Sequence, residues 1–390
     1  MSFARMKRFL VPLFVFSCCL LGLLTGCSLP QVSAQDRLFL PLSLEWVGEV
    51  TLPKQEFQET TVGGLSAIAY DRQRDRLYAL SDDRSFYGPA RFYTLNLSLD
   101  PFEIDVETVT VLKTPEGTPY AEGSLDPEGL ALTPNQTLLI ASEGVADQQI
   151  PPAIAEYDRQ TGQWLNQLPI PQRYIPETSG KEQQKGVQNN LGFESLTTNP
   201  IGLVPTTGEP LRVFVATESA LIQDRDPEAK ELVKTRTRWM HYLLSEGPPL
   251  LVSEHFYELD TPEPDILSQG LTEILALDEP GHFLTLERSF NGSVVTAKLF
   301  QAVTGSASDI SNVSSLQGNL GELKPIRKQL VLDLDRLDIT LDNLEGMTFG
   351  PHFADGSPSL ILVSDDNFNS YQKTQFLLFR ILTMDSSREG

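Results

Sequence analysis

Acidic side chains recur at two kinds of position in this sequence, and they have the clearest capacity for chemistry. Four glutamates stand at the start of short apolar segments: Glu128, Glu194, Glu273 and Glu345. A second acidic set closes the apolar segment that comes next in each copy: Asp82, Asp83, Glu143, Glu218, Glu287, Asp365 and Asp366. Carboxylates brought together repel and raise one another's pKa unless a cation neutralises them. If the segments superpose, the pattern predicts a site for one or two hard divalent cations, with Ca²⁺ the best match to a flexible oxygen cage.

We predict that the four glutamates are catalytic carboxylates and that five members of the second set are metal ligands: Asp82, Glu143, Glu218, Glu287 and Asp365. In the expected mechanism, the cation neutralises a phosphate group and lowers the pKa of an attacking water. A free carboxylate acts as the general base. A structural alternative stays open, because a glutamate at a strand start can accept backbone N–H bonds and fix a turn. Acidic residues at strand ends can likewise be solvated caps.

Three arginines lie next to these carboxylates in the sequence. Arg84, Arg91 and Arg288 follow the acidic pairs or open the next apolar segment. A guanidinium group can bind a phosphate or a carboxylate through two parallel hydrogen bonds. We therefore predict that these arginines bind the substrate. A salt bridge to the neighbouring carboxylates is the alternative for each of them.

Five copies of one pattern carry all these residues. Each copy has a Gly or Glu corner, a short apolar strand, a gap, a second apolar strand and then acidic residues. The corners stand at positions 64, 128, 194, 273 and 345, between 64 and 79 residues apart. The first corner is Gly64 rather than a glutamate, which predicts a gap in the ring of carboxylates.

The continuation of each copy predicts how the chain closes. A third strand and usually a fourth follow the acidic residues, but the fifth copy ends after its third strand, at residues 375–381. The apolar segment 42–52 at the other end of the chain can supply the missing strand. Such end-sharing is typical of a closed, all-β propeller, in which it hides the free sheet edges. We predict a single domain over 41–385 with five blades. Six blades, with one degenerate copy in the longer spacings, and a solenoid are the alternatives.

The overall composition narrows the classes of partner. The chain has 390 residues, with 30 Lys and Arg against 52 Asp and Glu, which gives a net charge of −22. This balance argues against nucleic acid and against a polybasic attachment to anionic lipid. Beyond residue 27 there is no cysteine, and the four histidines show no zinc-site spacing. We expect a monomer that binds a small phosphate ester or another ester.

The first residues predict export. Basic residues precede a 16-residue apolar run, and Leu24-Thr25-Gly26-Cys27 follows it like a bacterial lipobox. We predict a signal peptide over 1–26, a lipidated Cys27 and a tether over 27–40. The protein would then be extracytoplasmic, in the cell envelope, and attached to a membrane through its lipid anchor only. An ordinary signal peptide with an incidental cysteine is the alternative.

Several motifs together resemble one known family. They are Gly63-Gly64-Leu65-Ser66, Ser81-Asp82-Asp83, Ala90-Arg91-Phe92-Tyr93, Asp126-Pro127-Glu128-Gly129-Leu130, Ser142-Glu143-Gly144, Gly192-Phe193-Glu194-Ser195-Leu196 and Asn343-Leu344-Glu345-Gly346-Met347. The chain is similar to the phytase-like family, described as "esterase-like activity of phytase", over about residues 45–384. The resemblance implies an exported bacterial protein with recurring Glu and Asp and a phosphoesterase or esterase activity.

We therefore expect a lipid-anchored, metal-dependent phosphoesterase. Two alternatives belong to other classes: a non-catalytic envelope-binding scaffold with a structural cation, and a metal-assisted carboxylesterase or lactonase. Basic residues at the mouth of the carboxylate site would favour phosphate as the substrate. An apolar, aromatic mouth would favour an ester or a lactone.

Overall fold

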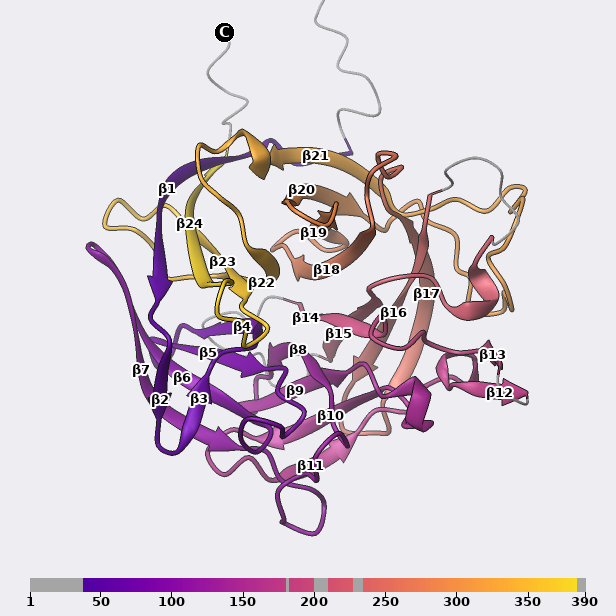
Figure 1. Ribbon diagram of the computed structural model, residues 1–390. Coiled ribbons are helices and arrows are strands. Elements are labelled where there is room, and N and C mark those ends of the chain that lie inside the picture. Colours follow the sequence, from indigo (N-terminus) through magenta and orange to yellow (C-terminus); the bar gives the residue numbers. More distant parts are fainter. Residues whose placement is uncertain (1–37, 180–181, 200–209, 227–233, 384–390) are drawn as a thin grey trace, which may run out of the picture. The chain divides into compact units, whose positions relative to one another are not determined.

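The computed structural model describes residues 38–179, 182–199, 210–226 and 234–383 (Figure 1). The chain divides into a unit Met1–Leu40 and a unit Pro41–Gly390. Only residues 38–40 of the first unit are described, so the predicted signal peptide, Cys27 and most of the predicted tether lie outside the described residues. None of the described helices has both the length and the apolar character needed to cross a membrane.

The second unit consists of five four-stranded antiparallel sheets, which we number as blades in chain order. Blade 1 contains β4 (Leu65–Asp71), β5 (Arg76–Ser81), β6 (Arg91–Leu99) and β7 (Phe102–Val111). Blade 2 contains β8 (Pro127–Leu132), β9 (Thr137–Ser142), β10 (Ala153–Asp158) and β11 (Trp164–Gln167). Blade 3 contains β14 (Phe193–Thr198), β15 (Leu211–Thr217), β16 (Arg236–Leu244) and β17 (Leu250–Glu258). Blade 4 contains β18 (Ser268–Ala276), β19 (His282–Phe290), β20 (Val295–Val303) and β21 (Arg327–Asp333).

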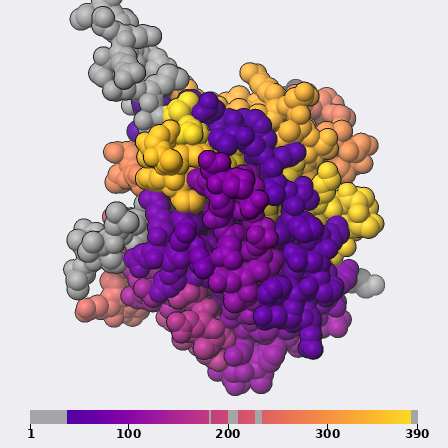
Figure 2. All heavy atoms as spheres, turned by 90° about the vertical axis from the view of Figure 1, so that its left-hand side faces the viewer, coloured from indigo at the N-terminus to yellow at the C-terminus, as the bar shows by residue number. Residues whose placement is uncertain are grey.

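Blade 5 joins the two ends of the second unit. It contains β22 (Asn343–Phe349), β23 (Ser359–Asp365), β24 (Thr374–Thr383) and, on its outer side, β1 (Leu42–Leu52). The register of β1 and β24 runs antiparallel from Leu42 opposite Thr383 to Leu52 opposite Thr374. Figure 2 shows the indigo residues from the start of the propeller beside yellow residues from its end. The predicted five-bladed, all-β propeller with an N-terminal closing strand is thus confirmed.

The first strand of each blade faces the centre of the ring. These inner strands are β4, β8, β14, β18 and β22, and each contacts the next, including β22 with β4 (Figure 1). Apolar side chains fill the spaces between adjacent blades, since strands covered on both faces carry nearly continuous apolar runs. The ring therefore has no free inner edge, and all five inner strands begin at the same end of the axis.

The remaining elements are short and do not belong to the five four-stranded sheets. They are the hairpins of β2 (Gln55–Phe57) with β3 (Thr60–Val62) and of β12 (Glu177–Ser179) with β13 (Glu182–Lys185), and the 3₁₀ turns η1 (Ala146–Gln148), η2 (Gln172–Tyr174), η3 (Ile222–Asp224) and η4 (Leu334–Arg336).

A β-bulge interrupts every inner strand, near its start in β4, β8, β14 and β22 and at the middle of β18. The residue left without a partner in the register is Ser66, Glu128, Glu194, Thr272 or Glu345, in blades 1 to 5. A bulge inserts one residue and re-aims its side chain. Two predicted equivalences are therefore wrong: Ser66 rather than Gly64 matches the glutamates in blade 1, and Thr272 rather than Glu273 matches them in blade 4. A one-residue shift sends a side chain to the opposite side of a strand.

Candidate functional site

An acidic cavity of about 1000 Å³ opens at the end of the propeller where the inner strands begin. Its lining comes from all five blades and includes the buried Glu128, Glu194, Glu218, Glu345 and Asp365 and the half-buried Asp82. Exposed side chains such as Phe290, Val294 and Tyr371 form part of its outer lining. The cavity is therefore charged and buried inside, and partly apolar at its mouth.

Two rings of equivalent positions supply most of the charge. The first ring is the set of bulge residues, of which Glu128, Glu194 and Glu345 are acidic. The second ring is formed by the residues that follow or end the second strands: Asp82, Glu143, Glu218, Arg288 and Asp365. In blade 4 this position holds Arg288, which lies opposite Gly270 in the register, while Glu287 lies opposite Leu271. The prediction that Glu287 belongs to the second ring is therefore wrong by one residue.

Two groups of carboxylates could each hold a cation. One contains Asp126, Glu128 and Glu143, and the other contains Glu143, Glu194 and Glu218. Within each group, one oxygen per residue lies within 4.8 Å of the others. Hard cations such as Ca²⁺ and Mg²⁺ are bound by carboxylate oxygens of this kind. Five residues thus form two possible sites that share Glu143.

Asp126 is a site residue that the sequence analysis did not select. It lies two positions before Glu128 and is almost fully buried. Residues two before the bulge in the other blades are Gly64, Gly192, Gly270 and Asn343. Because this position holds different residue types in the five blades, the repeats did not point to Asp126, although Asp126 belongs to one of the motifs quoted above. An Asp and an Asn at a position otherwise occupied by Gly were the available signal.

The three glycines at this position make room for second-ring carboxylates. A Cβ on Gly64 would lie 2.1 Å from Oδ1 of Asp82, and a Cβ on Gly270 would lie 2.1 Å from Oε1 of Glu218. The backbone N–H of Gly192 donates a 2.7 Å hydrogen bond to Glu143. The absence of a side chain therefore allows Glu143 and Glu218 to pack against the inner strand of the following blade, and Asp82 to pack beside the inner strand of its own blade.

Burial governs the protonation of this acidic cluster, which we define as Asp82, Asp126, Glu128, Glu143, Glu194, Glu218, Glu345 and Asp365. Burial raises the pKa of Glu218 to about 7 and that of Asp126 to about 6. Burial and then the charge of Glu194 raise the pKa of Glu128 well above its ordinary value. The pKa of each of the other five carboxyl groups is also raised, with burial the largest cause. Such a cluster favours cations or protons as its counter-charge.

Two of the three predicted substrate-binding arginines lie in the cavity. Arg84 pairs with Asp126 at 2.7 Å and donates to Asn190 at 2.6 Å. Arg288 pairs with Glu218 at 3.0 Å and also with Glu345. Six cluster carboxylates line the cavity with these two arginines, and Asp126 contacts Arg84 beside it, so the arginines neutralise only part of the negative charge.

The third arginine, Arg91, lies elsewhere. Its side chain is fully buried, pairs with Asp83 at 2.6 Å and donates to the carbonyl oxygen of Thr61 at 2.6 Å. It does not line the cavity. Its contacts favour the salt bridge, the alternative given for each arginine.

Two predicted carboxylates are also separated from the acidic cluster. Glu273 accepts hydrogen bonds from the backbone N–H groups of Ile274, Leu196 and Met347. Glu287 accepts hydrogen bonds from the Tyr257 hydroxyl at 2.6 Å and from the backbone N–H of Asp260 at 3.0 Å. It also contacts Lys328.

One further observation supports a divalent cation in the acidic cavity. Oδ1 of Asp82 is buried and has no hydrogen-bond partner in the part of the chain that the structure describes. An unpaired buried carboxylate oxygen is costly unless a proton, a water or a cation satisfies it. The all-oxygen donor set, its burial and this oxygen together agree with a hard cation near the acidic cluster.

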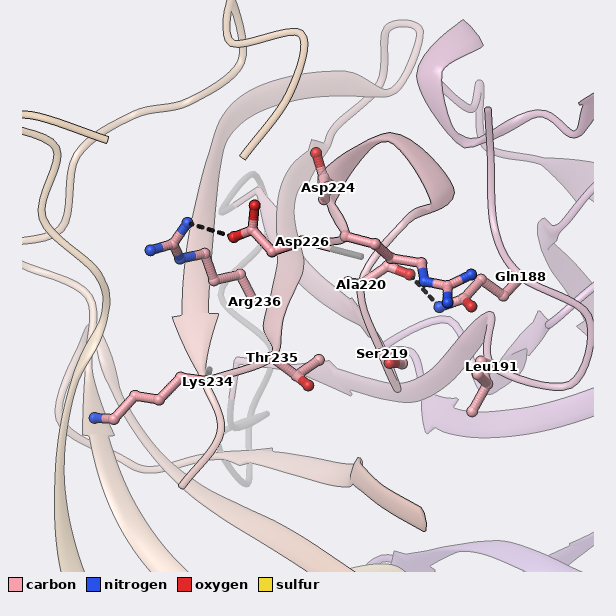
Figure 3. A pocket seen from close by; sticks show the side chains of 10 residues that line it. Gln188, Leu191, Ser219, Ala220, Asp224, Asp226, Lys234, Thr235 and Arg236 are labelled. Carbon is pink, nitrogen blue, oxygen red and sulfur yellow. Dashed lines mark hydrogen bonds and ion pairs between the residues drawn. The ribbon is translucent and has the colours of Figure 1, made fainter. Parts of the chain in front are cut away.

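A second cavity, of about 260 Å³, lies beside β16 (Figure 3). Arg236 faces Asp226 across it at 4.0 Å and binds Glu258 at 3.3 Å. The Arg238 guanidinium donates hydrogen bonds from Nε and Nη2 to the two carboxylate oxygens of Asp224, at 2.6 and 3.0 Å. These charged groups are paired with one another, so this cavity is a weaker candidate than the acidic one.

Comparison with known proteins identifies a matching family. A family model described as "Phytase-like: Esterase-like activity of phytase" matches residues 60–368. No curated protein matches the chain. Among solved structures, the chain is similar to an endo-arabinase from Bacteroides thetaiotaomicron VPI-5482, with 12% identity, coverage of 83% of this chain and 96% of that chain, and a TM-score of 0.41. It is also similar to the catalytic domain of a GH62 α-L-arabinofuranosidase from Coprinopsis cinerea, with 9% identity, coverage of 87% and 97%, and a TM-score of 0.43. Similarity at this level does not extend to chemistry.

Proposed function

Because the chain belongs to the phytase-like family, we propose that its acidic cavity is the active site of a cation-dependent hydrolase that acts on a phosphate ester. The observation that carries this proposal is an excess of carboxylates over arginines: six carboxylates of the acidic cluster line one cavity with two arginines, and Asp126 and Glu143 lie beside that lining. A phosphate group cannot approach that charge without a compensating cation, because like charges repel strongly at low dielectric.

The carboxylates of blades 2 and 3 would hold the cation. They are Asp126, Glu128, Glu143, Glu194 and Glu218, which form the two groups that share Glu143. A bound divalent cation would polarise the phosphoryl group and lower the pKa of a bound water. Ca²⁺ is our first choice of ion, because Ca²⁺ accepts several carboxylates in irregular geometry.

The two arginines would orient the phosphate. Arg84 and Arg288 project into the same cavity from blades 1 and 4. Each has donors committed to carboxylates, so a phosphate would exchange for one of these contacts. Guanidinium groups bind phosphate through two parallel hydrogen bonds, which gives orientation as well as charge.

Asp82 is the proposed general base. It lines the cavity, stands outside the two cation-holding groups and has an unpaired Oδ1. Its pKa is raised well above the ordinary value by burial and then by the charges of Glu345 and Asp126. A carboxylate of raised pKa accepts a proton from water more readily near neutral pH.

A carboxylic ester is the second candidate substrate, and one observation favours it. The mouth of the cavity carries exposed Phe290, Val294 and Tyr371 beside the arginines. Apolar surface of this kind would bind an acyl or aryl group as well as the organic part of a phosphate ester.

The cellular setting is a proposal from the sequence. We propose that the protein is exported, lipidated on Cys27 and held at a membrane of the cell envelope as a monomer. The lipobox-like segment supports this, and mass spectrometry of the mature N-terminus would test it. An unlipidated Cys27, or its removal with the signal peptide, would contradict the proposal.

The decisive experiment uses the purified protein treated with a chelator. We would measure the melting temperature and the hydrolysis of 4-nitrophenyl phosphate and 4-nitrophenyl acetate with and without added Ca²⁺. Ca²⁺-dependent phosphate release that is lost in Glu143→Gln supports the proposal. The matched control is Glu103→Gln, which changes an exposed glutamate on β7.

Each other outcome selects a different function. Faster hydrolysis of the acetate would favour the carboxylesterase. A higher melting temperature without turnover would favour a binding scaffold with a structural cation. No response to Ca²⁺ or to other divalent cations would overturn the cation site.

A further inference from the structure

The acidic cavity extends outward from the acidic cluster on one side only. Its lining continues between blades 4 and 5, along the β19–β20 hairpin, the connection before β22 and the loop between β23 and β24. We call this extension the arm. Its apolar side chains are Phe290, Val294, Val295, Ile339, Leu341 and Tyr371, and neutral polar side chains lie among them: Ser268, Ser293, Thr296, Thr340, Asn367, Asn369 and Gln372. The two blades that flank it are neighbours in the ring (Figure 1).

The arm differs in charge from the acidic cluster. Among the described residues that line the cavity, the basic side chains are Arg84 and Arg288, and both lie beside the cluster carboxylates. The acidic residues along the arm have local partners. Asp342 accepts hydrogen bonds from the backbone N–H groups of Asn343 and Lys373, and Asp335 accepts one from Ala297. The arm therefore offers no cationic group to a second anionic substituent.

Arg288 stands at the junction of the two regions. It neutralises part of the charge of Glu218 and Glu345 on this side of the cavity, and Phe290 follows two residues later on β19. Alternate residues of a strand lie on the same face. An anionic group beside Arg288 would therefore leave its organic substituent directed along the apolar side chains of the arm.

The size of the cavity leaves room for such a substituent. A volume of about 1000 Å³ is far more than one phosphate group and its cations occupy. Pockets near that size accommodate organic ligands, and the apolar and neutral polar side chains of the arm suit an uncharged one.

We infer that the arm is the subsite for a neutral, largely apolar organic group of the substrate, and that the protein prefers esters with one anionic group over polyanionic esters. This inference rests on the proposed function, because it takes the acidic cluster as the place where the anionic group binds. An aryl or alkyl group can contact the apolar side chains of the arm, whereas each further phosphate would meet apolar, neutral polar or acidic neighbours and no basic side chain among the described lining residues.

The test compares two exposed phenylalanines. Phe290 lines the arm, whereas Phe86 lies on the β5–β6 loop and does not line the cavity. We expect Phe290→Ser to lower kcat/KM for 4-nitrophenyl phosphate by about tenfold. The kcat/KM for glycerol phosphate should change by no more than about twofold, since apolar contacts contribute only to binding of the aryl substrate. Phe86→Ser should change neither. Val294→Asn, at a more exposed arm residue, provides a second variant with little risk to folding.

A binding measurement separates the arm from the hydrolase. Phenylphosphonate and methylphosphonate are titrated calorimetrically into the Ca²⁺-loaded protein, and we expect phenylphosphonate to bind about tenfold tighter, a preference lost in Phe290→Ser. This preference without turnover would support the arm and overturn the hydrolase. Turnover with equal changes on both substrates, or faster hydrolysis of a polyphosphorylated ester than of 4-nitrophenyl phosphate, would overturn the arm.

Discussion

Arg288 is the most informative single residue of the cavity. It occupies the ring position where the other four blades place a carboxylate, and its guanidinium contacts Glu218 and Glu345. Its side chain is only 14% exposed. It therefore acts as a counter-ion for two carboxylates of the acidic cluster.

Removing this counter-ion should therefore destabilise the protein. We expect Arg288→Met to lower the free energy of unfolding in chelator by about 2–4 kcal/mol, because the variant leaves buried carboxylates unpaired. Added Ca²⁺ should recover part of that loss. Urea denaturation measures both values. Arg336→Met, at a side chain that is 78% exposed, is the control and should change little. An unchanged stability would show that the carboxylates are protonated rather than paired.

The pH dependence of stability follows from the same carboxylates. The folded-state pKa of Glu218 is about 7 and its ordinary value is 4.5. Between these pH values the folded protein binds more protons than the unfolded chain, so the stability of the cation-free protein falls as pH rises. We expect the melting temperature in chelator to decrease from pH 4.5 to about 7.

Ca²⁺ should oppose this decrease and raise the melting temperature most at the high end of the range, since cations and protons compete for the same oxygens. Glu218→Gln should flatten the dependence. A melting temperature that rises over this range in chelator would contradict the proposed burial of charge.

The geometry of the site depends on contacts between an inner strand and a carboxylate of the preceding blade. Gly270 on β18 is the clearest case, because a Cβ there would lie 2.4 Å from Cγ of Glu218. Glu218 belongs to one of the two cation-holding groups. The spacing of neighbouring inner strands thus controls where a ligand carboxylate can lie.

A methyl group at Gly270 should displace that ligand without unfolding the blade. We expect Gly270→Ala to weaken Ca²⁺ binding about tenfold, a loss typical of residues that position metal ligands. Calorimetric titration of Ca²⁺ gives the affinity. The control is Gly247→Ala, where a Cβ would have no neighbour within 4 Å. Equal affinities of the two variants would exclude Glu218 from the cation site.

Glu273 has a role in closing the propeller that its position in the sequence did not reveal. Its carboxylate accepts N–H groups from β18, from Leu196 on β14 and from Met347 on β22. It therefore connects three of the five inner strands around the ring. Together with the β1–β24 pairing, which joins the two ends of the unit, this contact helps to close the propeller.

This arrangement predicts a structural rather than a catalytic phenotype. Glu273→Ala should reduce the free energy of unfolding by about 3 kcal/mol, because it leaves buried backbone donors without an acceptor. Glu273→Gln should lose less, since it keeps an acceptor oxygen. Both variants should retain the Ca²⁺ affinity of the parent protein in calorimetry. Loss of Ca²⁺ binding in Glu273→Gln at unchanged stability would instead support the original assignment as a catalytic carboxylate.

The architecture could be predicted from the repeats. Apolar strands of similar length, repeated five times, with a spare strand at one end and a missing strand at the other, permit few solutions other than a closed five-bladed ring. The same repeats identified Glu128, Glu194 and Glu345 as equivalent positions, because a bulge in the same place preserves their spacing.

The register in blades 1 and 4 and the neighbours of each carboxylate could not be predicted and are fixed by the packing of the blades. The bulge shifts the pairing by one residue, so the apolar pattern alone could not distinguish Thr272 from Glu273 or Arg288 from Glu287. The repeats gave only a weak signal for Asp126, which stands where three blades have Gly, and none for the arm, since each depends on contacts between blades. Local patterns specify strands, whereas a site at the centre of a ring is made by residues that are far apart in the chain.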